Sequence, residues 1–493
     1  MSESIPRQRL TLGLDLGTSA VKVVAMGRDG EVVGEGAAGF DTHDALPRQA
    51  EQHTADWLRA ASAAMHALAQ ALGASGTQWT DNWTEHIAAI GLTGQLPTLV
   101  CLDEVKPLGP AITWKDGRAD AWAASRLDSA RRRLMYARTG MPIDGRYLAP
   151  MLQFHYGHRI AEVRTILSAK DYLLSELTGL RLTEPSTAAG YGIYDLQERR
   201  FSEDLAEFWQ LPCALLPRIQ GANTLAGPLS EAGAALLGLR AGIPVSTGAA
   251  DSVCASFAMA GLDERVVSIS FGSSAVVIGA SAAARLDDAA RYLVTPHVND
   301  AWYGREMDLL ATGTGYRWLS DLFTWTSGDI DRYAARSVPG AHGLCFPPYL
   351  AGGEQGALWN PRLQGAIFGL GLRHSRADIA RSFLEGVFFE IKRCIEVLAE
   401  TAPVESVMVS GNVVRSPSSV QMLADILQRP VGTVADKSPA AVGAALLARR
   451  IAGAAFDLDR RLLAQPMIQP DEATARLYAD LYRQYLAKAK LCE

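Results

Sequence analysis

The stretch Leu10-Thr11-Leu12-Gly13-Leu14-Asp15-Leu16-Gly17-Thr18-Ser19-Ala20-Val21-Lys22-Val23-Val24-Ala25 is the first strongly patterned part of the chain. Apolar residues alternate before a Gly-Thr-Ser turn and a β-branched run follows it, which is typical of two strands joined by a tight turn. The stretch therefore predicts a hairpin. Arg28-Asp29-Gly30 is the next turn signal and Glu31-Val32-Val33 begins a third strand, so we expect the chain to open with an antiparallel meander.

The same pattern returns about half a chain later, at residues 266–278. Aligned on the turns, the two copies match glycine with glycine and hydroxyl with hydroxyl: Gly272 over Gly17, Ser273 over Thr18 and Ser274 over Ser19. A chance likeness between two glycine turns is the alternative. A repeat at this spacing favours two related domains, each opening with its own hairpin. We place the boundary near Gly261, which gives domains at 1–261 and 262–493.

The composition limits the classes of protein to consider. Of 493 residues, 48% are apolar and 20% are charged, as in an ordinary globular protein. The net charge of −6 provides no basic field for nucleic acid or an anionic membrane. No apolar run approaches the length of about 18 residues that spans a bilayer, and the start, MSESIPRQRL, lacks an apolar leader. The six scattered cysteines form no C-x-x-C pair and read as reduced thiols, so a cytoplasmic location is expected.

Periodicity and turn residues predict the remaining main elements. Helices are expected at residues 53–72, 171–177, 377–398, 418–428 and 440–451, and buried strands at residues 87–92, 243–248 and 407–409. Ser410-Gly411-Asn412 reads as a turn after the last of these strands. Gly34-x-Gly36-x-x-Gly39 resembles a dinucleotide fingerprint as text, but no helix start follows it, so we discount it.

The two hairpin turns carry the first chemical signal. Successive backbone N–H groups and hydroxyls in such turns form a concavity that suits phosphate oxygens, so two turns could grip a nucleoside triphosphate. Asp15 ends an apolar strand two residues before the first turn, where a lone carboxylate is costly unless something pairs with it. A magnesium ion that bridges phosphates is one such partner, and Lys22 could reach phosphate or solvent. The alternative for Asp15 is a carboxylate that caps the turn.

Asp251 follows a predicted strand and the small residues Gly248-Ala249-Ala250, which leave room for a ligand. A carboxylate in this place can accept the proton of a substrate hydroxyl, and helix N-capping is the alternative role. Gly411-Asn412 joins a strand to a helix whose N-terminus can receive a phosphate or adenosine group. Trp114-Lys115-Asp116-Gly117-Arg118 combines an aromatic face with polar groups that suit sugar recognition. On composition alone a solvated salt bridge is the stronger interpretation of that segment.

Together these motifs resemble the FGGY carbohydrate kinases, and within them the xylulokinase-like branch, over nearly the whole chain. The segments that carry the likeness appear in the family's order: Leu14-Asp15-Leu16-Gly17-Thr18-Ser19, Gly91-Leu92-Thr93-Gly94-Gln95, Trp114-Lys115-Asp116-Gly117-Arg118, Lys170-Asp171-Tyr172-Leu173, Ser186-Thr187-Ala188-Ala189-Gly190, Gly248-Ala249-Ala250-Asp251 and Phe271-Gly272-Ser273-Ser274. The resemblance implies an α/β fold of two ribonuclease-H-like domains of the actin and hexokinase type, with the active site in the interdomain cleft. The first domain would be the sugar-binding side and the second the nucleotide-binding side.

The resemblance also implies a reaction and its residues. ATP and Mg²⁺ would be the cofactors, and the γ-phosphoryl group would pass to a hydroxyl of a small sugar. Asp251 would be the general base, and Asp15 would help to hold the metal and the phosphates. The nucleotide would lie along Gly17, Thr18, Ser19, Lys22, Gly272, Ser273, Ser274, Gly313, Gly411, Asn412 and Ser416, whereas the sugar would contact Gln95, Leu96, Pro97, Trp114, Asp116, Arg146 and Ser252.

The identity of the sugar is less defined, because the chain departs from the xylulokinase pattern. Leu96-Pro97 stands where Met-His is usual, and Ser252 stands where Asn is usual, so hydrogen-bond partners of the sugar are lost. A triple glycine of the adenosine loop is here Ser410-Gly411-Asn412, which bears on nucleotide preference. A ketopentose such as D-xylulose is the first expectation.

Three alternatives stay open. Arg146 would suit a sugar acid such as gluconate, a polyol is a further acceptor, and a catalytically weak sensor of sugar or nucleotide would share the fold. The expected partners are a small sugar, no nucleic acid and no membrane. The oligomeric state is open, with a homodimer among the options.

Overall fold

The computed structural model describes residues 10–74, 82–326, 328–351, 354–436, 438–453 and 467–492. Residues 1–9, on which the expectation about an apolar leader rests, lie outside the described part. The chain divides into two compact units, of which the first comprises Met1–Ala258, Val294–Tyr303 and Ser438–Leu458. The second unit comprises Met259–Leu293, Gly304–Lys437 and Asp459–Glu493. The chain therefore enters each unit three times.

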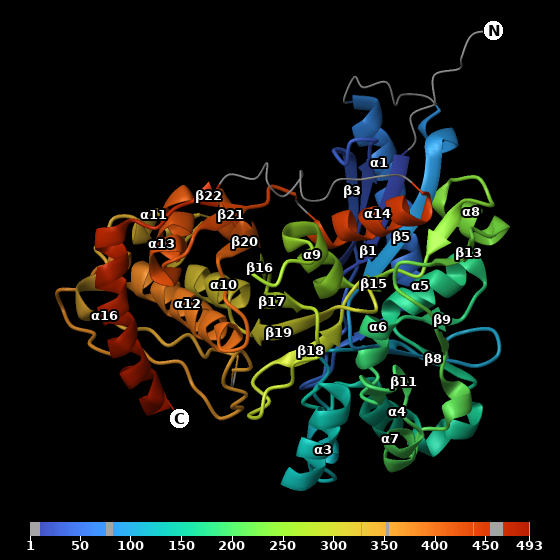
Figure 1. The fold of residues 1–493 in the computed structure, drawn as a ribbon, viewed down its shortest axis with the longest axis horizontal. Coiled ribbons are helices and arrows are strands. Elements are labelled where there is room, and N and C mark those ends of the chain that lie inside the picture. Colours follow the sequence, from blue (N-terminus) through green and yellow to red (C-terminus); the bar gives the residue numbers. More distant parts are fainter. Residues whose placement is uncertain are drawn as a thin grey trace. The chain divides into compact units, whose positions relative to one another are not determined.

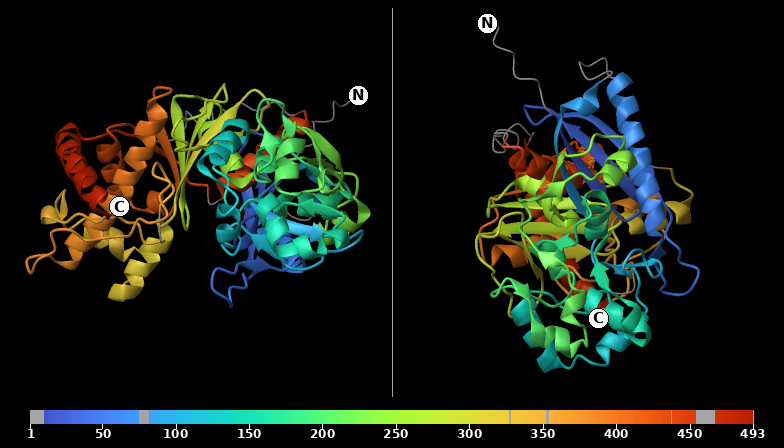
Figure 2. Two further views of the ribbon diagram at one scale, coloured as in Figure 1. Left: turned by 90° about the horizontal axis from the view of Figure 1, so that it is seen from below. Right: turned by 90° about the vertical axis from the view of Figure 1, so that its right-hand side faces the viewer.

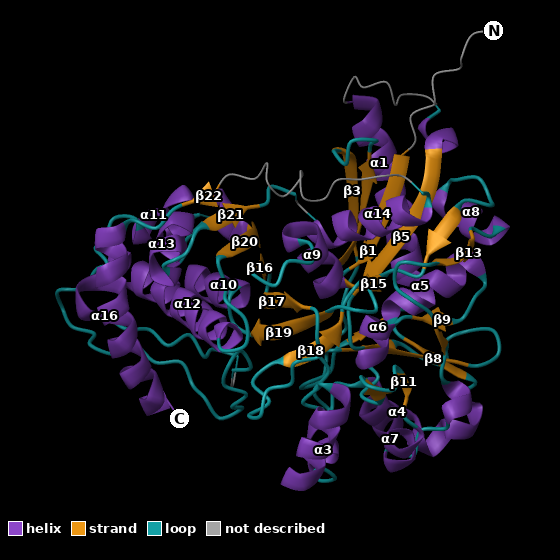
Figure 3. Cartoon of the chain, in the orientation of Figure 1, coloured by secondary structure: helices purple, strands orange, loops and turns teal. Residues whose placement is uncertain are grey.

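A mixed sheet forms the centre of the first unit (Figure 3). Strand β1 (Leu10–Leu16) pairs antiparallel with β2 (Ala20–Met26), and β2 pairs antiparallel with β3 (Val32–Gly39). The predicted hairpin and meander are thereby confirmed. On its other edge β1 pairs in parallel with β5 (Ile87–Gly94). The sheet has the order β13-β14-β5-β1-β2-β3, with β15 paired to the end of β5; these strands are β13 (Leu225–Pro228), β14 (Pro244–Ser246) and β15 (Ala249–Ala250).

The second unit repeats this strand arrangement. Strand β16 (Val266–Phe271) pairs antiparallel with β17 (Ala275–Ser281) and in parallel with β20 (Ser406–Gly411), as β1 pairs with β2 and β5. Strand β20 then pairs in parallel with β21 (Val431–Thr433), as β5 pairs with β14. The repeated order confirms the prediction of two related α/β domains. The remaining strands here are β19 (Tyr303–Leu309), which follows β17 in the sheet, β22 (Met467–Ile468), which follows β21, and β18 (Leu293–Pro296), at which the chain returns to the first unit.

Helices surround both sheets (Figures 1 and 3). Those of the first unit are α1 (Thr54–Ala74), α2 (Asp120–Ala124), α3 (Ser129–Thr139), α4 (Leu148–Tyr156), α5 (Ala169–Thr178), α6 (Pro185–Ala189), α7 (Glu203–Phe208), α8 (Glu231–Leu237), α14 (Pro439–Ile451) and the start of α9 (Asp251–Ala260). Those of the second are α10 (Gly313–Phe323), α11 (Asp329–Ala334), α12 (Arg376–Ala399), α13 (Pro417–Leu427) and α16 (Glu472–Ala489). The first unit also holds a small sheet of β4 (Glu51–Gln52), β7 (Ala111–Thr113), β6 (Thr98–Leu102) and β8 (Thr165–Leu167), and the short strand pairs β9 (Leu182–Thr183) with β12 (Arg218–Ile219) and β10 (Tyr194–Asp195) with β11 (Arg200–Phe201).

Helix α14 lies directly on the central sheet of the first unit, although it comes from near the C-terminal end of the chain (Figure 1). A Cβ atom on Gly13 would lie 1.9 Å from the carbonyl oxygen of Ala441, and one on Gly91 would lie 1.8 Å from that of Ala444. No side chain fits in these spaces, so the helix backbone rests on β1 and β5. Glycine is therefore required at both positions by close approach rather than by a turn.

Helix α1 packs on the meander in a similar way. A Cβ atom on Gly36 would lie 2.1 Å from the carbonyl oxygen of Ala64 in α1. Gly34, Gly36 and Gly39 all lie within β3, so they do not form the strand–turn–helix of a dinucleotide site. The sequence interpretation that discounted this motif is confirmed.

The core of the second unit is built around α12, which matches the long helix predicted at residues 377–398. Charged side chains are buried within it, and their hydrogen bonds and ion pairs offset the cost of removing them from water. Glu385 accepts hydrogen bonds of 2.9 Å from the Arg381 guanidinium, the Tyr478 hydroxyl and the Gly340 backbone. Tyr478 belongs to α16, which runs beside α12 (Figure 2). These bonds hold the C-terminal helix against the unit.

The other predicted helices and strands are present, with two differences. The strand predicted at residues 243–248 is shorter and comprises only Pro244–Ser246. Residues 410–411 continue β20 instead of forming a turn, and the chain bends only at a short 3₁₀ segment, Asn412–Arg415. The strand extends because Ser410 and Gly411 pair with Ser270 and Phe271 of β16. Among the described helices, none has the length and apolarity needed to cross a bilayer.

We predict that Gly13→Ala destabilises the first unit by about 1–3 kcal/mol or more, because the new methyl group must displace the backbone of α14. Gly73→Ala is the matched control, since a Cβ there meets nothing within 4 Å and alanine favours the helix. Urea unfolding followed by circular dichroism measures both. Equal stability of Gly13→Ala and the wild type would show that α14 is not in backbone contact with β1.

Candidate active site

Asp15 lies near the end of β1, fully within the sheet, and is 4% exposed. Its Oδ2 accepts a long hydrogen bond of 3.5 Å from the Ser438 hydroxyl, and its Oδ1 has no hydrogen-bond partner among the described residues. Burial raises the pKa of this carboxyl, and the nearby charge of Lys22, its partner across the hairpin, opposes that rise. The turn is closed instead by the Gly17 N–H, which donates to the Ala20 carbonyl at 3.1 Å. The carboxyl therefore does not cap the turn and retains an unused buried oxygen.

Gln95 follows β5 and connects two of the segments that the sequence singled out. Its N–H donates to the Leu16 carbonyl at 2.8 Å, and its side-chain amide donates to Oε1 of Gln52 at 2.8 Å. The Gln52 amide in turn donates to the Thr18 carbonyl at 2.8 Å, and the Trp114 indole donates to the Thr18 hydroxyl at 3.2 Å. A continuous set of bonds thus fixes the first phosphate-type turn relative to the candidate sugar residues.

Asp116 is buried, which corrects the interpretation of its segment as a solvated salt bridge. Its side chain is 1% exposed and accepts from the Arg118 guanidinium at 2.7 Å and from the Ala50 N–H at 2.9 Å. Arg118 also pairs with Glu51 at 2.5 Å. These contacts are therefore buried or partly buried and connect the Asp116–Arg118 segment to residues 50–51. The alternation of charges in the sequence could not distinguish such a buried ion pair from a surface pair.

Arg146 forms a two-pronged ion pair with Asp144. Its Nε donates to both carboxylate oxygens at 3.0 and 3.1 Å, and its Nη2 donates to Oδ2 at 2.5 Å. Burial lowers the pKa of this guanidinium, but the charge and hydrogen bonds of Asp144 outweigh that effect and raise it overall. The charge of Arg146 is thus largely balanced by a neighbour two residues away.

Asp251 is the first residue of α9 and is partly exposed. The strand before it is held on both sides: the Thr93 hydroxyl donates to the Ala249 carbonyl at 2.8 Å, and the Ala250 N–H donates to the Ser186 hydroxyl at 2.9 Å. The Ser252 N–H donates to Oδ1 of Asp251 at 2.9 Å, which orients the carboxylate. Asp251 therefore belongs to the start of a helix and also carries a fixed, accessible carboxylate.

Glu184 supports this arrangement through Ser186, and the sequence analysis did not identify it. It is fully buried, and burial raises the pKa of its carboxyl. It accepts hydrogen bonds of 2.8 Å from the Ser186 N–H and hydroxyl and one of 2.7 Å from the Thr187 N–H. The hydroxyl of Ser186 is thereby directed so that it can accept from Ala250.

Leu96 and Pro97 are half-buried and lie beside Gly190. A Cβ atom on Gly190 would lie 3.1 Å from Leu96 Cδ1 and 3.7 Å from Pro97 Cβ. The two residues that replace the usual Met-His pair thus give this part of the first unit an apolar surface.

The second unit contains a cavity of about 420 Å³ beside its hairpin turn. Three of the residues predicted from the family to lie along the nucleotide line it, namely Gly272, Gly313 and Asn412. Gly313 begins α10, and a Cβ there would lie 2.2 Å from the Gly272 carbonyl, so only glycine permits this close contact. The Thr314 N–H donates to the Ser273 carbonyl at 3.0 Å and fixes the turn.

The other residues that line this cavity form an apolar part and a polar part. Leu384, Val387 and Phe388 of α12 supply apolar surface. The Tyr316 hydroxyl donates to Asp331 at 2.5 Å, which fixes two polar lining residues relative to each other. A flat apolar group could therefore lie against α12 while an anionic group lies at the turn.

The second unit's other nucleotide candidates do not line this cavity but are next to its lining residues in the sequence or in the turn. Gly411 has a φ of +91°, and a Cβ there would lie 2.0 Å from the Phe271 carbonyl. Ser416 caps α13 by accepting from the Ser419 N–H. Ser274 accepts from the Gly272 N–H at 2.8 Å through its carbonyl.

Comparison with known proteins resolves what these two sets of residues belong to. Residues 10–258 match the N-terminal domain of the FGGY family of carbohydrate kinases, and residues 267–452 match its C-terminal domain. The chain belongs to the FGGY family of carbohydrate kinases. It is thus a phosphotransferase that acts on a sugar hydroxyl.

Relatives of this FGGY kinase match it along nearly its whole length. It is 25% identical over 506 residues to a gluconokinase of Bacillus subtilis (strain 168), covering 98% of this chain and 96% of that protein. It is 29% identical to the xylulose kinase of Escherichia coli (strain K12), covering 95% of each. The crystal structure of xylulose kinase from Rhodospirillum rubrum superimposes with a TM-score of 0.86 at 29% identity, covering 98% of this chain and 99% of that one. The two-domain fold expected from the resemblance is confirmed.

In this FGGY kinase the predicted site residues form two groups, one in each unit. The first unit holds Asp15, Gly17, Thr18, Ser19, Lys22, Gln95, Leu96, Pro97, Trp114, Asp116, Arg146, Asp251 and Ser252. The second holds Gly272, Ser273, Ser274, Gly313, Gly411, Asn412 and Ser416. The sequence analysis did not identify Gln52, Glu184, Tyr316 or Asp331, because each acts through partners that no local motif reveals.

We predict that Asp15→Asn is more stable than the wild type at pH 8, by about 1–3 kcal/mol, because burial disfavours the charged carboxylate. Burial raises the pKa of Asp15 in the folded state. The free-energy cost of burying its charge is therefore absent below the unfolded-state pKa of about 4 and fully present above the folded-state pKa. The advantage of the variant should shrink as the pH is lowered. Urea midpoints at several pH values measure this effect, with Asp41→Asn, an exposed carboxyl, as control. A less stable Asp15→Asn at pH 8 would contradict it.

Proposed function

We propose that this carbohydrate kinase uses ATP and Mg²⁺, with Asp251 as general base and Asp15 at the metal and phosphates. The observation that carries the proposal is the alignment of three strand ends. Asp15 pairs in register with Thr93 of β5, and Thr93 pairs in register with Ala249 of β15. The two carboxylates therefore arise from the same edge of one sheet, where an acceptor hydroxyl and a phosphoryl group can be held side by side.

Asp251 takes the proton in the proposed reaction. A sugar hydroxyl within hydrogen-bond reach of its carboxylate would give its proton to Asp251 as the sugar oxygen bonds to the γ-phosphorus, while the bond from that phosphorus to the β,γ-bridging oxygen breaks and ADP leaves. The Ser252 N–H bond and the Ser186 support of Ala250 hold the carboxylate in one orientation, so little reorganisation is needed during transfer. Positioning of this kind is the main protein contribution to phosphoryl transfer.

The donor set at Asp15 fits magnesium. Its buried Oδ1 lacks a partner, and among the described residues no cluster of three or more histidine, cysteine, aspartate or glutamate side chains could hold a metal. Mg²⁺ commonly takes one or two carboxylates and completes its shell with water and substrate phosphates, so a single carboxylate suffices. When bound, the ion would neutralise charge on the phosphate oxygens.

The 420 Å³ cavity supports ATP as the donor. Its apolar wall of Val387 and Phe388 suits the base, and the hairpin turn at Gly272 suits phosphate oxygens. Asn412 adds an amide at the start of the 3₁₀ segment that follows β20. The turn residues Gly17, Thr18 and Ser19 with Lys22 would serve the phosphates from the first unit.

For the acceptor we infer a neutral sugar, with a ketopentose such as D-xylulose first. The charge of Arg146 is engaged by Asp144, so the site offers little unbalanced positive charge to a carboxylate. The xylulose kinases of Escherichia coli and Rhodospirillum rubrum, both 29% identical, support the same choice. Gluconate is the second candidate, because the gluconokinase of Bacillus subtilis matches 98% of this chain.

We predict that Asp251→Asn lowers kcat by about 10²- to 10⁴-fold, the usual contribution of a general base, without loss of the fold. Steady-state phosphorylation of the best acceptor and a melting curve measure the two effects. Asp204→Asn serves as control, since that carboxylate is 84% exposed and lies elsewhere in the same unit. Turnover within threefold of wild type in a folded Asp251→Asn protein would remove this residue from the mechanism.

We predict that kcat/KM is higher for D-xylulose than for D-gluconate, and that Asp144→Asn shifts this ratio towards gluconate by about tenfold. The substitution releases Arg146 from its ion pair, and a hydrogen bond to a charged group contributes about 1.5–3 kcal/mol. Asp128→Asn is the control, because Asp128 pairs with Arg131 on an exposed helix end. Preference of the wild type for gluconate would overturn the choice of a neutral acceptor.

A further inference from the structure

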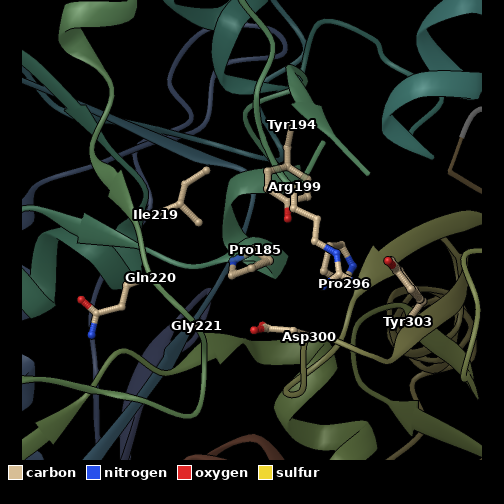
Figure 4. Close-up of a pocket in the computed structure, with 9 residues that line it drawn as sticks. All are labelled: Pro185, Tyr194, Arg199, Ile219, Gln220, Gly221, Pro296, Asp300 and Tyr303. Carbon is tan, nitrogen blue, oxygen red and sulfur yellow. The ribbon is translucent and has the colours of Figure 1, made fainter. Parts of the chain in front are cut away.

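Another cavity, of about 150 Å³, lies in the first unit and is formed by residues that are absent from the candidate active site. Figure 4 shows the side chains of Tyr194, Arg199, Asp300 and Tyr303 around a common space beside the rings of Pro185 and Pro296. They come from the hairpin of β10 and β11, the start of α6 and the segment Val294–Tyr303. The hairpin and the segment Val294–Tyr303 contribute the polar groups, whereas the start of α6 contributes the ring of Pro185; Gln220, which follows β12, also lines the hollow.

The lining of this cavity includes one positive and one negative side chain, so its formal net charge is zero. Arg199 is a cation and Asp300 an anion, and among the described residues no ion pair joins them or engages either side chain elsewhere. Each therefore keeps its capacity for a ligand. The hydroxyls of Tyr194 and Tyr303 can both donate and accept hydrogen bonds.

This combination selects a ligand with hydroxyl groups. An anion bound to Arg199 would be repelled by Asp300, and an ammonium group bound to Asp300 can only donate. A hydroxyl can donate to the Asp300 carboxylate and accept from the Arg199 guanidinium, so several hydroxyls on one small carbon chain can bond to both charged groups and to the two tyrosine hydroxyls. The amide of Gln220, which also lines the cavity, already donates to the Thr224 hydroxyl at 3.1 Å and the Leu225 carbonyl at 2.6 Å. Pro185, Pro296 and Ile219 provide apolar surface for the C–H groups between them.

We propose that this cavity is an accessory binding site for a small neutral polyol or sugar, separate from the site of phosphoryl transfer. Its volume of about 150 Å³ suits a molecule of roughly the size of a pentose rather than a nucleotide. The proposal does not depend on the chemistry assigned to Asp251.

The position of the cavity would let such a ligand influence the segment that holds Asp251 in place. Pro185 lines the cavity and stands between Glu184, which caps α6, and Ser186, which holds the Ala250 N–H. Tyr194 lies near enough to Glu184 for the two to interact electrostatically. A bound polyol would therefore touch the segment that fixes the backbone just before Asp251.

The test is equilibrium dialysis of the full chain with radiolabelled xylitol, which cannot be confused with a nucleotide ligand. We expect the wild type to bind two molecules per chain and Arg199→Ala to bind one, because its accessory site weakens by about 10- to 100-fold when the charged donor is lost. Asp300→Ala should have the same effect. Arg200→Ala is the matched control, since Arg200 is adjacent, pairs with Glu198 and does not line the cavity.

Two results would overturn the proposal. Equal xylitol binding by the wild type, Arg199→Ala and Arg200→Ala would show that the cavity does not bind a polyol. Binding of glycine that depends on Arg199, without such binding of xylitol, would assign the cavity to a zwitterion instead. Failure of the proposed function is distinguishable, because it would appear as absent phosphorylation while the Arg199-dependent molecule of xylitol still binds.

Discussion

The close contact between α14 and the central sheet of the first unit is the constraint on which the candidate site depends. Without side chains at Gly13 and Gly91, the helix backbone rests on β1 and β5, and the residue that precedes the helix, Ser438, reaches the end of β1. There its hydroxyl bonds to Asp15, 423 positions earlier in the sequence. The C-terminal part of the chain thus completes the environment of a carboxylate that the first strand supplies.

The sheet edge that results explains why the polar residues of the first unit gather. Strands β1, β5 and β15 run in parallel, so their carboxyl ends lie at one edge, and Asp15, Gln95 and Asp251 are located at or just after those ends. Apolar packing covers the interior of the strands, whereas the ends must be satisfied by side chains, loops or ligands. Asp251 and Asp15 meet this demand differently, since one carboxylate is partly exposed and the other is buried with an unused oxygen.

Much of this could be predicted from the sequence, because alternation and glycine turns are local signals. The hairpins, the long helix α12 and the carboxylates after strands follow from patterns a few residues long. The supporting residues do not, since Gln52 and Gln95 are 43 positions apart and Ser186 and Ala250 are 64 apart. Their types, glutamine and serine, are also common on surfaces. Only the folded arrangement shows that they are buried and paired.

The two units share one topology yet differ in chemistry at the equivalent point. In the repeat that aligns Gly272 with Gly17, Ser270 takes the place of Asp15, and its hydroxyl lies 3.7 Å from the sulfur of Met259. The second hairpin therefore offers no buried carboxylate and opens instead beside the 420 Å³ cavity with an apolar wall. This divergence at a single strand position accords with the proposal that the first unit holds the cation and the acceptor and the second holds the nucleotide.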